Sequence, residues 1–505
     1  MSTLTQALFS ARPTGDQRPW PRFAVDAPAW QALAAGLGEG RGRFLGLWGE
    51  AAAVHLALLP EASAEPLVVT LDCPEGAYPS VAHHHPPAGR LERTIFDLTG
   101  LTASASPDRR PWLDHGRWGL RHPLGAHPDP AESLPPYVFL PAEGRALHQI
   151  PVGPVHAGII EPGHFRFTAA GETVVRLEER LGYVHKGIEA LMAGKTPAEA
   201  AKLAARTSGD STVAYSWAFA RAVEAALGVT VPERALLLRA LMAELERLAN
   251  HFGDIGAICN DAAFALMLAH CGVLRERVLR AAAACFGHRL MMDAVVPGGV
   301  ALADGALDLS PVRALIDHAA KAFPPLVKLY DETASLQDRT VKTGIVKPAL
   351  ARLYHPGGYV GRASGIAFDA RREIPYAPYD RLNFEVPVLT QGDVNARIWI
   401  RIREVEQSLS LIGQILAALP PGGPVQVDLP TVAEPREGLA LVEGFRGDVL
   451  VWLRLDGQGK VARCHLRDPS WFQWPLLEAA IEGNIVADFP LCNKSFNCSY
   501  SGQDL

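Results

Sequence analysis

The side chains that could bind a metal or act as nucleophiles are thinly spread along this chain. Seven cysteines occur among its 505 residues, at positions 73, 259, 271, 285, 464, 492 and 498. None of them forms the close pairs from which zinc sites and iron–sulfur clusters are built, and the last two are too far apart to be more than weak evidence for a metal. Scattered thiols in odd number predict reduced cysteines and an intracellular chain, not a disulfide framework.

Three further places hold polar groups that could do chemistry. His83, His84 and His85 are adjacent, but neighbouring side chains rarely converge on one ion, so we favour a solvated loop over a metal site. The stretch Arg206-Thr-Ser-Gly-Asp-Ser-Thr-Val-Ala-Tyr215 is a polar turn before a helical pattern. The chain end, 497–505, is Asn-Cys-Ser-Tyr-Ser-Gly-Gln-Asp-Leu. Taken alone, these two stretches are ordinary polar turns.

The composition is that of a globular protein long enough for two domains. Hydrophobic residues make up 48% of the chain and charged residues 20%. The net charge of -6 and the lack of any basic run argue against a nucleic-acid partner. Charges interrupt the apolar runs before they reach the length of a membrane span. Residues 1–7 lack the basic and apolar parts of a signal peptide, which again predicts an intracellular chain.

Residues 1–145 are predicted to form a small α+β domain. Three strand-like runs precede an amphipathic helix, which begins near Leu91 and is closed by Gly100. A proline-rich linker at 134–141 ends the domain. The strand-like runs cover 44–49, 54–59 and 67–72.

Residues 146–505 are predicted to form a mainly helical domain with small β elements at its rim, so that the fold class is α+β. Thr230 and Glu233 have the spacing of a capping box, which predicts a helix that begins there. Two prolines, at 324 and 325, are expected to interrupt another helix. The helical patterns cover 230–250, 261–288, 310–336 and 393–419, with Asp261 and Asp393 as candidate caps, and the paired strand patterns cover 164–168 with 173–178 and 447–455 with 461–466.

Short motifs along the chain resemble one family of respiratory proteins. Two N-terminal motifs are similar to the 30-kDa subunit of respiratory complex I. The longer part resembles the 49-kDa complex I subunit and, more closely, the large subunit of group 4 [NiFe] hydrogenases of formate-hydrogenlyase type. The resemblance implies a hydrogenase large-subunit-like domain after a 30-kDa-like one. In chain order the motifs are Glu92-Arg-Thr-Ile-Phe-Asp-Leu-Thr-Gly-Leu101, Arg121-His-Pro-Leu124, Gly153-Pro-Val-His-Ala-Gly-Ile-Ile-Glu-Pro-Gly-His-Phe-Arg-Phe167, Gly182-Tyr-Val-His-Lys-Gly-Ile-Glu189, Val231-Pro-Glu-Arg-Ala235, Glu244-Leu-Glu-Arg-Leu-Ala-Asn-His251, Phe445-Arg-Gly-Asp448 and Asp468-Pro-Ser-Trp471.

The chain departs from its hydrogenase relatives at the metal site. Nickel-bearing members have an Arg-x-Cys-Gly-x-Cys-x-x-x-His motif, whose cysteines fall on Ser208 and Ser211 and whose histidine falls on Tyr215. A second pair of ligand cysteines falls on Cys498 and Ser501. A serine hydroxyl is a poor ligand for a thiolate-bound nickel–iron pair, so we expect this chain to bind no nickel and no other metal. Nickel-bearing members also carry a C-terminal extension that is clipped, and we expect none here.

Complex I has lost the same metal, and the vacated cavity helps to receive the quinone headgroup there. The resemblance therefore implies a cavity lined by the four former ligand positions, by Tyr215 and by His156, which matches a histidine bordering the quinone site. The tyrosine that binds quinone in complex I falls on Gly209, so a quinone and another acceptor both stay open. For His156 the alternative is a loop histidine bonded to backbone.

Three charged residues are candidates for the chemistry itself. Glu161 matches a proton-relay glutamate of the hydrogenases, with a plain surface loop as the alternative. Arg446 matches an arginine that sits over the metal cavity, where a fixed cation would stabilise a reduced, anionic acceptor. Asp210 is new charge in the vacated turn, and it is either a proton donor or a polar turn residue. His185 is expected to face the partner subunit that carries the proximal [4Fe-4S] cluster.

The resemblance implies a core oxidoreductase subunit of a membrane-associated complex related to hydrogenases and NADH:quinone oxidoreductase. A complex I 20-kDa-like small subunit would pass electrons from its [4Fe-4S] cluster to a quinone or another acceptor. Antiporter-like membrane subunits would couple this to ion translocation at the cytoplasmic face of the inner membrane, and a formate- or NADH-oxidising module is a further expected partner. Two alternatives stay open, a catalytically dead scaffold or coupling subunit and a true [NiFe] hydrogenase.

Overall fold

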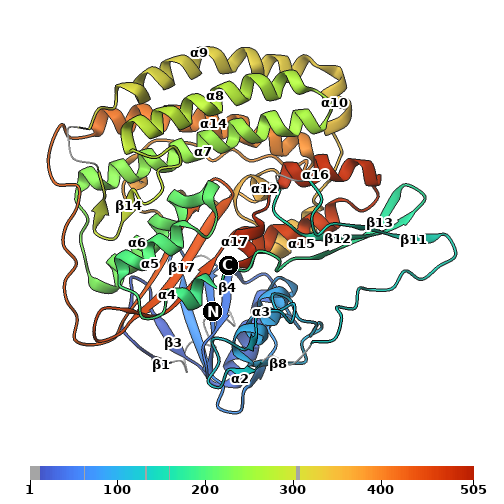
Figure 1. The fold of residues 1–505 in the computed structure, drawn as a ribbon, viewed down its shortest axis with the longest axis vertical. Helices are drawn as coiled ribbons and strands as arrows, with labels where there is room; N and C mark the ends of the chain where they lie inside the picture. The colour runs from blue at the N-terminus through green and yellow to red at the C-terminus, as the bar shows by residue number, and fades with distance from the viewer. Residues whose placement is uncertain (1–11, 62, 131–133, 158–159, 303–306) are drawn as a thin grey trace.

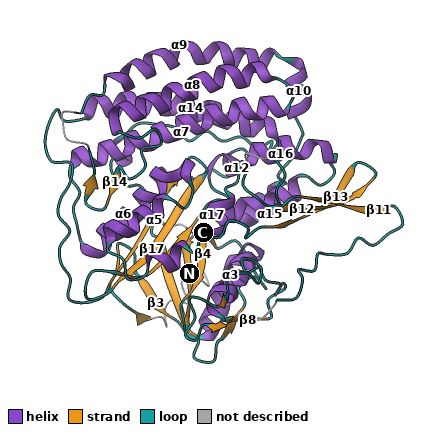
Figure 2. Cartoon of the chain, in the orientation of Figure 1, coloured by secondary structure: helices purple, strands orange, loops and turns teal. Residues whose placement is uncertain are grey.

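The computed structural model describes residues 12–61, 63–130, 134–157, 160–302 and 307–505. Long helices form a layer along one side of the molecule, the larger sheets lie below them, and a three-stranded sheet projects from the body (Figure 1). Helices and strands occupy largely separate regions (Figure 2). The fold class is therefore α+β, as predicted.

The N-terminal region is built on a five-stranded sheet with the order β1-β3-β6-β5-β4. Strand β4 is buried along its whole length, because helices pack on one of its faces and a second sheet packs on the other. Gly100 adopts the left-handed conformation, with φ of 80°, that ends α3. The three predicted strands and the helix are confirmed. The elements are β1 (Arg12–Pro13), β3 (Arg22–Ala24), α2 (Ala27–Gly38), β4 (Gly42–Gly49), β5 (Ala53–Pro60), β6 (Leu67–Asp72) and α3 (Gly89–Thr99).

The histidine loop is solvated in part. His83 and His84 are exposed, whereas His85 is buried, with its ring centroid 5.4 Å from that of Phe44. Burial lowers the pKa of His85 to about 4, so it is neutral at pH 7. The interpretation as a solvated loop was wrong for this residue, because the chain turns inward there to begin α3. The short elements nearby are β7 (Ala77–Pro79), η1 (Pro86–Ala88), β8 (Thr102–Ser104), β9 (Leu120–Arg121) and β10 (Asp129–Pro130).

A second sheet joins the two ends of the chain. Its order is β18-β17-β16-β2, so a strand from the N-terminal region pairs with one from the C-terminal region. Trp48 packs on Trp452 in the core between the two sheets. The division at residue 145 therefore stays a prediction, and the core runs across it. The predicted hairpin of β17 and β18 is confirmed, and β16 had not been predicted. The strands are β2 (Gln17–Arg18), β16 (Arg436–Gly444), β17 (Gly447–Leu455) and β18 (Val461–Arg467).

The ends of the two central helices differ from the prediction. Helix α7 begins at Glu233, but Thr230 does not cap it; the capping position is Pro232, which makes no side-chain hydrogen bond. A complete capping box instead joins Thr196 and Glu199 at the start of α5. Asp261 ends α7 and does not cap the next helix. The bounds are α5 (Pro197–Ala205), α6 (Thr212–Leu227), α7 (Glu233–Asp261) and α8 (Ala265–Phe286).

Helix α9 runs through its two prolines without a break, so the predicted interruption was wrong. Pro324 and Pro325 are exposed, and so are Ala320 and Lys321, whose carbonyls lose their helical partners. Water can satisfy those carbonyls, which makes the prolines tolerable. Asp393 caps α14 as predicted and accepts a hydrogen bond from Ala396 N at 2.7 Å. The bounds are α9 (Ser310–Glu332), α10 (Ala334–Thr340) and α14 (Val394–Ala418).

The remaining elements surround the chain end. The projecting sheet has the order β11-β12-β13 and contains the predicted hairpin. Within the described ranges, none of the helices combines the length and apolarity needed to cross a bilayer. The bounds are β11 (Leu147–Val152), β12 (His164–Ala170), β13 (Thr173–Arg180), α4 (Ile188–Met192), η2 (Gly209–Ser211), β14 (Val295–Val296), β15 (Gly299–Val300), α11 (Pro348–Tyr354), α12 (Gly358–Arg362), α13 (Ala370–Glu373), η3 (Tyr379–Arg381), α15 (Ser470–Ala480), η4 (Val486–Asp488), α16 (Phe489–Phe496) and α17 (Tyr500–Asp504).

Candidate functional site

Segments far apart in sequence meet at one cavity beside the chain end. Its volume is about 740 Å³, which lies within the range of small-molecule sites. The wall is formed by residues from 152–157 and 160–161, the turn 208–210, helices α7 and α8, the tip of the β16–β17 hairpin and the chain end. The predicted site residues that line it are His156, Glu161, Ser208, Asp210, Arg446, Cys498 and Ser501.

Arg446 reaches the cavity from the tip of a tight hairpin. The strands pair as far as Gly444 and Gly447, so Phe445 and Arg446 form a two-residue turn. The start of α12 passes so close to this turn that a Cβ on Gly358 would lie 2.0 Å from the carbonyl oxygen of Arg446. Glycine is required there, and the close backbone contact fixes the tip of the hairpin.

The guanidinium of Arg446 joins the turn 208–211 to the chain end. It donates to both carboxylate oxygens of Asp210, from Nη1 to Oδ1 at 2.8 Å and from Nη2 to Oδ2 at 2.6 Å. Nη1 also donates to Ser211 Oγ at 3.0 Å, and Nε donates to Asn497 O at 2.5 Å. Only 4% of Arg446 is exposed, so these contacts satisfy a charge that water hardly reaches.

Asp210 is ionised in this arrangement. Ser208 Oγ donates to its Oδ1 at 2.8 Å, and Ser211 Oγ donates to the same atom at 3.3 Å. Burial on its own would raise the pKa of this carboxyl, but the charge and hydrogen bonds of Arg446 outweigh burial and lower the pKa of Asp210 below its ordinary value. In this state Asp210 accepts hydrogen bonds and holds no proton to donate.

Helix α7 holds the turn from behind. Asn250 Nδ2 donates to the carbonyl oxygen of Asp210 at 2.8 Å. The carboxyl group of Glu246 accepts hydrogen bonds from Val213 N at 2.7 Å and from Ala214 N at 3.2 Å, where α6 begins. Sequence reasoning missed these two residues. Their signal was a pair of polar residues four apart, which places them on the same face of the helix.

The chain end closes the other side of the cavity. Ser499 caps α17 by accepting from Gly502 N at 2.9 Å, and its hydroxyl lies 2.9 Å from Ser208 Oγ. Ser501 N donates to Glu161 Oε2, also at 2.9 Å. Glu161 is exposed and lines the cavity. This position is compatible with both interpretations of Glu161, the surface loop and the proton relay.

Two titratable side chains in the wall, His156 and Cys498, are uncharged at neutral pH. His156 packs on Phe165 and Tyr500, and its buried Nε2 has no hydrogen-bond partner among the described residues. Burial lowers the pKa of His156. Burial also raises the pKa of the Cys498 thiol well above its ordinary value, so it is protonated. The thiol lies 4.0 Å from Gln473 Oε1.

The other predicted site residues lie behind the wall or away from it. Ser211 is buried and reaches the cavity only through its bonds to Asp210 and Arg446. Tyr215 is fully buried in α6 and donates to Asp468 Oδ2 at 2.6 Å. His185 lies at a different, smaller cavity, where it stacks on Trp118 and bonds Asp504 O at 2.7 Å.

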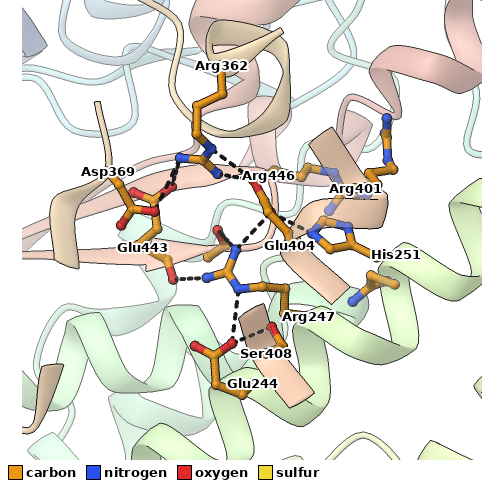
Figure 3. Close-up of polar contacts among 12 residues, drawn as sticks. Glu244, Arg247, His251, Arg362, Asp369, Arg401, Glu404, Ser408, Glu443 and Arg446 are labelled. Carbon is orange, nitrogen blue, oxygen red and sulfur yellow. Dashed lines mark hydrogen bonds and ion pairs between the residues drawn. The ribbon is translucent and has the colours of Figure 1, made fainter. Parts of the chain in front are cut away.

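A buried network of charges supports the hairpin that carries Arg446 (Figure 3). Arg247 on α7 donates to the carbonyl oxygens of Glu443 and Gly444 at 3.0 and 3.1 Å. Arg362 bonds Glu443 and Glu404 at 3.0 and 2.7 Å. These side chains are at most 2% exposed, so each charge depends on its partner. The network also contains Glu244, His251, Asp369 and Arg371.

The sequence predicted a helix over 230–250 but not this network of charges within it. The signal was present in the helix, where Glu244, Arg247 and His251 recur at spacings of three and four among leucines. Charges at helical spacing inside an apolar stretch predict a buried ion pair, because unpaired charges are not retained there.

Two family models match the longer part of the chain. Residues 261–440 and 432–504 match the model of the respiratory-chain NADH dehydrogenase 49 Kd subunit. Residues 186–253 match the model of nickel-dependent hydrogenases.

Individual relatives cover more of the chain. It is 32% identical over 446 residues to formate hydrogenlyase subunit 5 of Escherichia coli (strain K12), an alignment that spans 86% of this chain and 78% of the relative. It is 30% identical over 470 residues to hydrogenase-4 component G of the same organism, across 90% and 80% of the two chains. It is 32% identical over 357 residues to an NADH-quinone oxidoreductase subunit of Roseiflexus sp. (strain RS-1), across 67% and 94%.

A solved structure shares the fold. A chain of the membrane-bound sulfane sulfur reductase, an archaeal respiratory membrane complex, aligns with a TM-score of 0.67 and 27% sequence identity. The alignment covers 72% of this chain and 99% of the other.

Proposed function

Because the chain belongs to the family of the 49-kDa subunit of respiratory-chain NADH dehydrogenase and the related hydrogenase large subunits, we propose that it is the core large subunit of a membrane-associated oxidoreductase complex and that it works without a nickel–iron pair. It takes electrons from a small subunit that carries a [4Fe-4S] cluster and passes them to an acceptor in the 740 Å³ cavity. The acceptor is a quinone or another small molecule reduced in the same cavity. The single observation that carries this proposal is the convergence of ionisable side chains on that one cavity.

The donor set at the former ligand positions does not fit a nickel–iron pair. Ser208 Oγ is engaged by Asp210 and Ser499, and Ser211 Oγ is engaged by Arg446. The thiol of Cys498 is the one sulfur donor among the four positions, and the rise in its pKa keeps it protonated. Soft metals of this kind need thiolates, and neutral hydroxyls do not replace them.

The side chains around the cavity suit the reduction of an oxygen-containing acceptor. A quinone becomes a quinol by taking up two electrons and two protons. Arg446 would favour the negative charge that builds up on the acceptor. His156 lines the same wall, and its buried Nε2, which has no partner among the described residues, would provide a hydrogen-bonding position for an acceptor oxygen. Glu161 is exposed in the same wall, where it would transfer protons from solvent to the acceptor.

The same proposal assigns the partners. The small subunit is complex I 20-kDa-like, and its cluster lies near the cavity on the side of His185. Antiporter-like membrane subunits hold the complex on the cytoplasmic face of the inner membrane and move ions, and a formate- or NADH-oxidising module supplies electrons. Homologous chains in membrane respiratory complexes support this arrangement.

Two measurements on the purified complex test the proposal. Metal analysis should find no stoichiometric nickel, and one nickel per chain would refute the proposal. Arg446→Ala should lower acceptor-dependent turnover by about a hundredfold or more, as the loss of a preorganised electrostatic group does. Glu161→Gln should lower it by at least about a hundredfold, as the loss of a general acid–base group does.

The control is Asp261→Asn, which changes another carboxyl in the cavity wall. It should leave turnover within about twofold of the parent, since surface-type substitutions away from the reacting groups have small effects. Unchanged turnover in all three variants would favour the scaffold or coupling role.

A further inference from the structure

The ion pair of Asp210 and Arg446 borders open space, unlike the ion pairs of the buried network. The side chain of Asp210 is 36% exposed, whereas Glu404 and Glu443 in the network are 2% and 0% exposed. Asp210 lines the cavity itself. A carboxylate in this position can leave its partner by side-chain rotation, and a molecule in the cavity can reach the same partner.

Four donor groups converge on the carboxylate of Asp210. Two are the terminal nitrogens of Arg446, at 2.8 and 2.6 Å, and two are the hydroxyls of Ser208 and Ser211, at 2.8 and 3.3 Å. Two parallel N–H groups with flanking hydroxyls are the donor pattern by which proteins bind carboxylates and other oxyanions. With the carboxylate turned away, these donors would face the cavity as a preformed oxyanion site.

We propose that Arg446, Ser208 and Ser211 form an oxyanion-binding subsite, that Asp210 occupies this subsite as an internal ligand, and that the anionic oxygen of the reduced acceptor displaces it. The identity of the anion that displaces Asp210 rests on the proposed function. The existence of the subsite does not depend on that function. Asp210 then has a regulatory role. It keeps Arg446 neutralised while a neutral acceptor enters, and its return expels the reduced product.

The turn has the freedom that this exchange needs. A Cβ built on Gly209 meets nothing within 4 Å, so space is open beside Asp210. The backbone of Asp210 stays anchored by Asn250, which confines the movement to the side chain. The other charged groups in the wall are Glu161, Asp261 and Lys494. Neither carboxylate bonds Arg446, so Asp210 is the one internal competitor among the described residues.

Acetate tests the subsite because it reproduces the carboxylate that Asp210 supplies. In the full-length Asp210→Ala variant, acetate should bind in the vacated position, and calorimetric titration should show an affinity at least about tenfold higher than in the parent protein, a difference of about 1.4 kcal/mol. Adding Arg446→Gln to this variant should abolish the gain. Asp261→Ala removes another carboxylate from the same cavity and should bind acetate no better than the parent, and chloride at equal ionic strength should give no response in any variant.

The result decides the proposal in either direction. Equal acetate affinity in the parent and in Asp210→Ala, or a gain that survives Arg446→Gln, would overturn it. If Asp210→Ala fails to fold, Asp210→Ser provides the same vacancy with a residue that polar turns favour. Acetate binding is measured without turnover, so a complex that reduces no acceptor would refute the proposed function while leaving the subsite intact.

Discussion

The contact of Gly358 with the Arg446 hairpin makes a quantitative prediction about Gly358→Ala. Gly358 has a φ of +63°, and its added Cβ would lie 2.0 Å from Arg446 O and 2.3 Å from Arg446 C. An alanine in the left-handed region costs about 1–2 kcal/mol. Forcing a methyl group into a packed site costs about 1–3 kcal/mol more. We therefore expect Gly358→Ala to lower the free energy of unfolding by about 2–5 kcal/mol, measured by urea-induced unfolding.

Substitutions at two further glycines distinguish the cost of the backbone conformation from the cost of the steric clash. Gly171 has a φ of +59° with nothing within 4 Å of a Cβ, so Gly171→Ala should show the backbone cost alone, about 1–2 kcal/mol. Gly413 lies in α14 with open space around it, so Gly413→Ala should stabilise the protein by about 0.5–1 kcal/mol. Equal losses in Gly358→Ala and Gly171→Ala would refute the close packing of α12 on the hairpin. A displaced hairpin tip should also lower acceptor-dependent turnover in Gly358→Ala, with turnover unchanged in the two controls.

Two other predictions concern buried charges. Arg362→Met should lower the free energy of unfolding by about 3–5 kcal/mol, because it leaves the carboxylates of Glu404 and Glu443 buried without their cation; a loss below about 1 kcal/mol would show that they find other partners. Burial opposes the ionisation of Glu189, but the charge of Arg463 and the contacts with Arg463 and His465 together outweigh burial and lower the pKa of Glu189 to about 2. The ionised carboxylate of Glu189 therefore stabilises the folded state above pH of about 4.5, and this stabilisation is lost as the pH falls towards 2. Glu189→Gln should lower the free energy of unfolding by about 3 kcal/mol at pH 7. The variant should also lose less stability in acid than the parent, measured by unfolding as a function of pH.

The elements predicted correctly from the sequence are those that depend on residues close together in the sequence. The strands of the N-terminal sheet and the hairpin of β17 and β18 follow from runs of apolar and β-branched residues between turns. Asp393 and Gly100 mark helix ends by chemistry within a few residues of themselves. The Thr230 cap failed, although its spacing matched, because helix α7 begins beside Pro232 and the threonine side chain makes no bond to it.

Strand β16 was missed because its charges have distant partners. Glu437 is buried in this strand and bonds Arg22, which is 415 residues away in the sequence. Glu443, in the same strand, bonds Arg362, which is 81 residues away. Read locally, two glutamates and two glycines in nine residues argue against a buried strand. The resemblance to known proteins predicted one cavity for Arg446 and the four former ligand positions. Arg446, Ser208, Cys498 and Ser501 line it, whereas Ser211 lies behind its wall. The resemblance could not show that Asp210 bonds Arg446 across 236 positions.

The ion pairs of the buried network and the pair of Asp210 with Arg446 differ in their access to solvent. This difference indicates which charges stabilise the fold and which can take part in binding or catalysis. Arg247 and Arg362 are buried with their carboxylates, and an exchange of partners there would leave a bare charge in the protein interior, at a cost of several kcal/mol. The carboxylate of Asp210 can turn from Arg446 into a cavity, where solvent or a ligand replaces the lost contact. The buried network supports the hairpin, and the hairpin presents Arg446 to Asp210, whose carboxylate borders the cavity. An apolar pair is often at least as stable as an ion pair in a protein interior, so an ion pair at the wall of a cavity favours a role in binding over a purely structural one.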